Sequence, residues 1–258
     1  GDTMKKTTTG LLALLALCCA PLAIADNHEK PPNIASVWKM SPKGDAGTAA
    51  FEDAMKAHMA WRMEQGDPRS WQVYTVSTGG DRDDYYVRAC CFTWADQDGY
   101  EKWAYDNNVS NTYYEQLGTM VEDLTHTFQA IDTENSNWNE DPNPFYYVGV
   151  TQFTPNPAMQ MQTGRTVEKM SQLAIEKGWN SDWAWYTVIG GASNLMLAAG
   201  YTHYADMAPP EQSFYQFAAA HLGEEEAMEM LENFGEGFWG STYKIYRWRE
   251  DLSMPRDN

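Results

Sequence analysis

The histidines are the side chains of this sequence best suited to acid–base chemistry or to holding a metal ion. The 258-residue chain has five of them. His58 precedes Met59 on the apolar side of a predicted helix, and His203 ends a predicted strand beside Tyr201 and Tyr204. We therefore predict His58 and His203 as candidate catalytic residues. The more ordinary role of each is that of a hydrogen-bonded histidine in or near the core.

Tryptophan is unusually frequent, with 11 residues, and aromatic residues make up 14% of the chain. Trp and Tyr combine a large apolar area with a polar tip, so they suit either a packed core or an aromatic-lined pocket. We predict that such a pocket is lined by aromatic residues in or beside the hairpin strands. These residues are Trp71, Tyr74, Trp94, Trp183, Trp185 and Tyr201. The simpler alternative is that the rings fill two cores.

The spacing of cysteine and histidine predicts no metal site. Cys90 and Cys91 are adjacent, no C-x-x-C spacing occurs, and adjacent residues of a strand point to opposite faces. We expect two free core thiols, because a bond between neighbouring cysteines would be strained. His221 could be an axial haem ligand, although no second feature supports that role. Phosphate-binding loops and the serine and zinc hydrolase motifs do not occur in the sequence.

The net charge of −18 makes some partners improbable. Nucleic acid and anionic membrane surfaces bind through concentrated Lys and Arg, which this chain lacks. With 43% hydrophobic residues the chain has enough apolar material for a core, so it is not disordered by composition. The expected partner is a small molecule, and a homo-oligomer is also compatible with the composition.

The first 25 residues read as a secretory signal peptide. Residues 1–3 resemble a residual tag, Lys5 and Lys6 give a positive start, and residues 10–22 form an apolar run. An A-x-A cleavage sequence then ends at Ala25. We therefore expect a bacterial protein that is periplasmic or secreted, with no membrane segment once residues 1–25 are removed.

The rest of the chain repeats itself. Residues 71–76 (WQVYTV) are matched 112 residues later by 183–188 (WAWYTV), and each copy is followed by a Gly-Gly pair. Weaker matches keep the same order, which predicts a tandem duplication. We predict one unit over residues 31–132 and a second over 145–250. The segment 133–144, rich in Asn, Asp, Glu and Pro, is the predicted linker.

Each unit shows the pattern strand, helix, two strands, helix, strand. In the first unit the strands are predicted at 34–40, 71–77, 85–94 and 125–131, around helices at 48–65 and from 96 to about 123. This order is the ferredoxin-like β-α-β-β-α-β arrangement. The hairpin strands are apolar on both faces, so both faces need cover. We predict an α+β protein whose two antiparallel sheets pack together as an α/β barrel.

These two units, the broken helix around Tyr100–Ala104 and the aromatic hairpins resemble the dimeric α/β-barrel superfamily. That group includes antibiotic-biosynthesis-type monooxygenases. The resemblance covers about residues 31–250 and is topological. It implies a pocket between sheet and helices, and an activity that uses either no cofactor or haem. In that superfamily the two units usually come from two chains, so the sequence leaves open whether this barrel forms within one chain.

Three functions are compatible with the sequence. The first is the binding of a small apolar or aromatic molecule in a barrel pocket by an exported protein. The second is a cofactor-free or haem-dependent monooxygenase-like enzyme. The third is a structural or interaction protein that has no ligand. A ferredoxin-like fold hosts many unrelated activities, so the fold does not choose among them.

Overall fold

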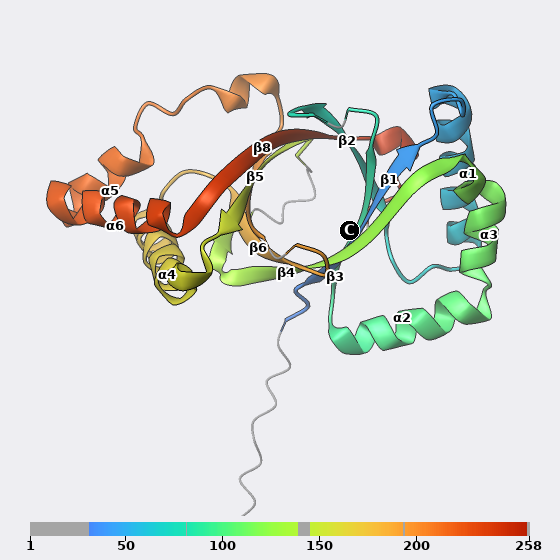
Figure 1. The fold of residues 1–258 in the computed structure, drawn as a ribbon, viewed down its shortest axis with the longest axis horizontal. Helices are drawn as coiled ribbons and strands as arrows, with labels where there is room; N and C mark the ends of the chain where they lie inside the picture. The colour runs from blue at the N-terminus through green and yellow to red at the C-terminus, as the bar shows by residue number, and fades with distance from the viewer. Residues whose placement is uncertain (1–30, 81, 139–144, 193, 257–258) are drawn as a thin grey trace, which may run out of the picture. The chain divides into compact units, whose positions relative to one another are not determined.

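The computed structural model describes residues 31–80, 82–138, 145–192 and 194–256 (Figure 1). The predicted signal peptide 1–25 lies outside the described residues, so export stays a prediction. Within the described part, no helix is both long and apolar enough to cross a membrane.

Both halves have the predicted order of elements. The first half consists of β1 (Ile34–Pro42), α1 (Thr48–Glu64), β2 (Gln72–Thr78), β3 (Tyr85–Phe92), α2 (Trp94–Asp106), α3 (Val109–Gln116), η1 (Gly118–Met120) and β4 (Val121–Asn137). The second half consists of β5 (Tyr147–Pro155), η2 (Pro157–Met159), α4 (Gln160–Lys177), β6 (Trp183–Ile189), β7 (Leu195–Tyr201), η3 (Tyr204–Met207), α5 (Phe214–Leu222), α6 (Glu224–Glu236), β8 (Phe238–Trp248) and η4 (Glu250–Leu252).

The eight strands form one closed barrel in the order β1-β3-β2-β8-β5-β7-β6-β4, and every neighbouring pair is antiparallel. The predicted α+β fold with barrel packing is therefore confirmed. Two pairings join the halves: β2 with β8, where Tyr74 faces Trp248, and β4 with β6, where Phe128 faces Ile189. The barrel thus closes within a single chain. Figure 1 shows α1–α3 on one side of it and α4–α6 on the other.

Local signals set several element ends. Thr93 and Asp96 form a reciprocal capping box at the start of α2, and Gly178 ends α4 in the left-handed conformation with φ of 72°. Strand β4 is longer than predicted, because it continues through Asn137 into the predicted linker. The remaining linker residues, 139–144, lie outside the described part. The unit boundaries and their origin by duplication stay predictions.

The helix-covered faces of the barrel hold the apolar cores. In the first half, one core cluster joins α1 to β2 and β3 through Phe51, Met55, Val73 and Val87. In the second half, Trp185 and its neighbours pack between the sheet and α4. Burial of such side chains is the main favourable contribution to folding.

Residues 249–254 complete the core of the first half. After β8, the Met254 backbone N–H donates to the Trp71 carbonyl (2.9 Å), and Arg249 N–H donates to the Val73 carbonyl (2.8 Å). Leu252 and Met254 are buried in the first core cluster. Arg249 also makes a two-pronged ion pair with Glu52 of α1, at 2.5 and 2.8 Å. Residues that follow the second half therefore stabilise the first.

The inside of the barrel is aromatic and polar. The rings of Tyr86 and Tyr246 lie 5.0 Å apart, edge to face. Arg88 Nε donates to Gln129 Oε1 at 3.4 Å across the strands. Burial raises the pKa of Tyr186, which lies near Tyr246 and Arg88. The second sheet face is thus covered by barrel closure, as its apolar pattern predicted, but several of its side chains are hydrogen-bonding groups.

The structure differs from the sequence prediction at the two adjacent cysteines. Cys90 and Cys91 are joined by a disulfide across a cis peptide bond, and both residues are exposed. The prediction of two free core thiols is therefore wrong. The argument from alternating strand faces assumed a trans peptide, and this pair does not have one.

Candidate functional site

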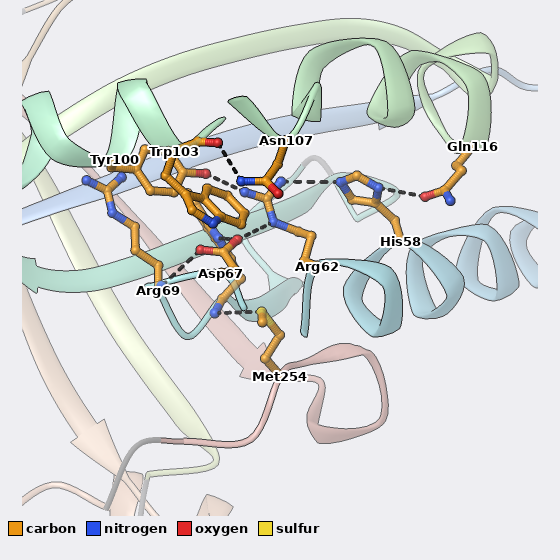
Figure 2. A network of polar contacts seen from close by, with 10 residues as sticks. His58, Arg62, Asp67, Arg69, Tyr100, Trp103, Asn107, Gln116 and Met254 are labelled. Carbon is orange, nitrogen blue, oxygen red and sulfur yellow. Dashed lines mark hydrogen bonds and ion pairs between the residues drawn. The ribbon is translucent and has the colours of Figure 1, made fainter. Parts of the chain in front are cut away.

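A buried ion pair lies where α1 ends and β2 begins. Arg62 Nε donates to Asp67 Oδ2 at 2.6 Å, and the Asp67 side chain is fully buried. The same carboxylate oxygen accepts from Trp71 Nε1 at 3.0 Å, and Asp67 Oδ1 accepts from the backbone N–H of Arg69 at 2.9 Å. Figure 2 shows Asp67 at the centre of these contacts. The pair holds the loop between α1 and β2 in one conformation.

The Arg62 guanidinium connects α1 to α2. It donates to the hydroxyl of Tyr100 and, at 3.3 Å, to Nε2 of His58. Burial raises the pKa of Tyr100 to about 12, so the hydroxyl stays protonated at neutral pH. Arg62 also lies over the Trp71 ring, 5.1 Å from its centroid.

His58, a predicted catalytic residue, is held by hydrogen bonds at both ring nitrogens. Arg62 can only donate, so His58 Nε2 must accept and Nδ1 carries the proton. That proton is donated to Gln116 Oε1 at 2.8 Å. Burial lowers the pKa of His58 from 6.5 to about 4. In this arrangement His58 is a neutral link between α1 and α3 and has no free ring nitrogen. Its catalytic role stays a prediction.

Acidification should weaken the fold through His58. Below pH 6.5 the unfolded chain binds a proton that the folded chain accepts only near pH 4. Neutral His58 therefore contributes to the free energy of unfolding above pH 6.5. This contribution, roughly 3 kcal/mol in all, is lost as the pH falls toward 4. Urea unfolding from neutral pH to about pH 5 should show a shallower loss in His58→Gln than in wild type. Exposed His221→Gln is the control; parallel profiles for wild type and His58→Gln would contradict the prediction.

Arg69 lies two residues after Asp67 in the sequence, and its side chain points toward α2. Its guanidinium lies 3.8 Å from the ring centroids of both Phe92 and Tyr100. Nη2 donates to Gln97 Oε1 at 2.6 Å, and Gln97 in turn donates to Glu101. Arg69 is only 9% exposed. Among the residues that the structure describes, no carboxylate forms an ion pair with this guanidinium.

Four aromatic side chains form a continuous cluster beside Arg69, which we name the aromatic surface: Trp38, Trp94, His126 and Phe128. The Trp38 and His126 rings are stacked at 4.1 Å with an angle of 14°. Phe128 lies edge-on to His126 at 4.7 Å and to Trp94 at 5.1 Å. Trp38 and His126 come from paired positions of β1 and β4, whereas Trp94 begins α2. The rings are half-buried, and Trp94 is 48% exposed.

Ser36 fixes the orientation of His126. Its hydroxyl lies 2.8 Å from His126 Nε2, and Ser36 itself is buried. Burial lowers the pKa of His126, so the ring is neutral at neutral pH. Within the described residues, His126 Nδ1 has no hydrogen-bond partner. A neutral imidazole that is held by a serine and has one free ring nitrogen can accept or donate a proton.

The other predicted site residues are scattered over the barrel. Tyr74 lies on β2 opposite Tyr86, on the interior face. His203 lies on an exposed turn before η3. Trp183 and Trp185 are buried against α4, and their indole N–H groups donate to the carbonyl of Asn135 and to Ser171 Oγ; these two rings fill a core.

Tyr201 lines an open depression of about 460 Å³ together with Trp179, Asp182 and Asp206. Most of the lining is polar, and Asp206 is already engaged by the backbone N–H groups of Thr202 and His203. Of the predicted set, only His58 and Trp71 share one hydrogen-bonded network, and Trp94 lies on the aromatic surface.

Sequence reasoning missed the residues that connect these features: Arg62, Asp67, Arg69, Trp38, Phe128 and, as a site residue, His126. The sequence did contain one signal, which concerned His126 and Phe128. His126 and Phe128 are two apart in a strand, so they share a face. In contrast, nothing in the loop 66–70 indicated where its charged side chains would point. Across the described ranges, no group of three or more His, Cys, Asp or Glu side chains is placed to hold a metal ion.

The fold is similar to solved structures of enzymes or candidate enzymes. A candidate monooxygenase from Fusobacterium nucleatum has a TM-score of 0.51 and 11% identity, over 84% of this chain and 92% of that one. One from Lactobacillus acidophilus has a TM-score of 0.50 and 8% identity, over 84% and 94%. Chlorite dismutase from Candidatus Nitrospira defluvii has a TM-score of 0.50 and 10% identity, over 86% and 94%. No protein-family model and no curated protein matches the sequence. At sequence identities this low, the structural similarity shows a common fold and nothing about function.

Proposed function

We propose that this chain binds a small planar aromatic molecule on the aromatic surface of its first half. The observation that supports the proposal is the stacked pair of Trp38 and His126, continued edge-on by Phe128 and Trp94, with all four rings partly exposed. Rings that only fill a core are buried, as Trp71 and Trp185 are. Offset stacking and edge-to-face contact with a bound ring would complete this cluster.

Binding can be tested with 2-naphthamide, a neutral planar probe, by tryptophan fluorescence and by saturation-transfer NMR. Wild type should bind the probe, and Trp38→Ala should weaken binding about tenfold or more, which corresponds to about 1.4 kcal/mol of lost stacking. The matched control is Trp239→Ala, which removes a tryptophan on β8 that is 70% exposed. Equal affinities in wild type and Trp38→Ala, with the circular dichroism spectrum unchanged, would contradict the proposed site.

A second candidate function is an enzyme of the monooxygenase-like kind. His126 favours it, because a neutral ring with a free Nδ1 next to a bound aromatic molecule can take a proton from an acidic C–H or O–H group. Turnover that falls in His126→Ala while probe binding remains would favour the enzyme over the binding protein. Absence of both binding and turnover would leave the structural role.

Three histidines, His58, His203 and His221, do not fit the role of a haem ligand. His58 uses both ring nitrogens within the protein, and His221 Nδ1 lies 2.8 Å from the Phe217 carbonyl on the exposed side of α5. His203 lies on an exposed turn. Neither the depression beside Tyr201 nor a second one of about 290 Å³ between α4 and α6 is lined by a histidine. These three histidines therefore support no haem-dependent step.

A further inference from the structure

We infer that the aromatic surface selects ligands that carry an anionic group, a carboxylate or phenolate, and that Arg69 recognises this group. The inference rests on the proposed function, because Arg69 lies at one end of the same cluster. Its guanidinium touches Phe92, whose ring lies 6.4 Å from that of Phe128. Arg69 is also close enough to lower the proton affinity of His126 by its charge.

Arg69, Arg88 and Arg256 each contact a neutral glutamine amide oxygen and have no ion pair among the described residues, and Arg69 is the most buried of the three. Arg62 has Asp67 as its counter-ion, and Arg249 has Glu52 and Asp251. Among the described residues, the Arg69 guanidinium instead donates one hydrogen bond, to the neutral amide oxygen of Gln97. Burying a cation without an anionic partner is costly, and the cost is recovered when an anion binds. In a chain with net charge −18, such a position needs an explanation.

The geometry leaves donors for an anion. An arginine has five N–H groups in one plane, and a carboxylate can accept two of them in parallel. Phe92 and Tyr100 occupy the space around the guanidinium at 3.8 Å, so they restrict its orientation. In the described part of the chain, Nε and Nη1 of Arg69 have no hydrogen-bond partner.

Three carboxylates act on the Arg69 charge and oppose an anion: Asp67, Asp96 and Glu101. Glu101 is exposed and accepts a hydrogen bond from Gln97 at 2.6 Å, so its carboxylate is linked to Arg69 through that amide. It partly neutralises the positive potential of the site and acts on His126 as well. Replacing Glu101 should therefore strengthen anion binding, whereas replacing Arg69 should weaken it.

The test compares 2-naphthoate with 2-naphthamide, which has the same rings and no charge. Wild type should bind the acid about tenfold more tightly at neutral pH, and the preference should shrink at high salt. Arg69→Gln should lose the preference and keep its affinity for the amide. Glu101→Gln should increase the preference. Retained binding of the amide by Arg69→Gln shows that this variant is folded, and Arg69→Lys, which keeps the charge, should retain part of the preference.

Two results would overturn the inference in distinguishable ways. If wild type binds the acid and the amide equally, or if Arg69→Gln keeps the wild-type preference, anion selection fails while the proposed binding function stands. If wild type binds neither compound, the proposed function fails and this inference fails with it.

Discussion

Replacing Asp67 by asparagine should lower the free energy of unfolding by about 3–5 kcal/mol, the loss expected when one partner of a buried ion pair is removed. Arg62 would keep its charge in a site where its Nε now faces a fully buried neutral side chain. The effect should be large because Asp67 also organises the loop through Trp71 Nε1 and the backbone of Arg69.

Urea unfolding at neutral pH measures this loss. Asp53→Asn is the matched control, because that carboxylate is 78% exposed and its pairing with Lys56, at 3.8 Å, is a surface contact. Such surface pairs contribute about 0–1 kcal/mol, so the control should stay close to wild type. A loss below about 1 kcal/mol in Asp67→Asn would show that the network does not hold the loop.

Truncating Leu252 to alanine should destabilise the protein by about 2–5 kcal/mol. Leu252 is 1% exposed and packs in the core cluster of the first half, although it follows the last strand of the second half. Removing its isobutyl group leaves a cavity in this core cluster that the surrounding side chains can fill only in part. The unfolding transition should stay single, because the barrel is one closed sheet.

The control for Leu252→Ala is Leu124→Ala, in which the same group is removed from a strand position that is 41% exposed. Its loss should be well below that of Leu252→Ala. Two separate unfolding transitions in wild type as well as in Leu252→Ala would show that the two halves unfold as independent units.

Much of the fold could be predicted because its signals are local. Alternating apolar residues and the Gly-Gly pairs after residues 71–77 and 183–189 predict the hairpins, since strand pattern and turn chemistry need only neighbours in sequence. The stop at Gly178 is likewise a local signal. The barrel could be predicted because a sheet with two apolar faces requires cover on both. Even so, the sequence did not show that β2–β8 and β4–β6 close it within one chain.

The candidate site could not be predicted to the same extent. Trp38 and His126 meet because β1 and β4 pair in one particular register, and a shift of one residue would place His126 on the other face. The two rings around Arg69 come from β3 and α2, and nothing near Arg69 in sequence indicates either. For the same reason the aromatic content suggested a pocket but not which rings form it, so Trp183 and Trp185 were included although they fill a core.

The sequence by itself therefore determined the secondary structure, the ferredoxin-like order of each half and the need for a second layer, because each depends on periodicity and on turn residues along a short stretch of chain. The tertiary structure decided that His58 uses both ring nitrogens within the protein, that Arg62 has a buried carboxylate partner whereas Arg69 has none among the described residues, and that Leu252 and Met254 pack in the core of the first half. These properties depend on contacts between residues far apart in sequence, and such contacts are fixed only when strands take their register and helices dock on the sheet.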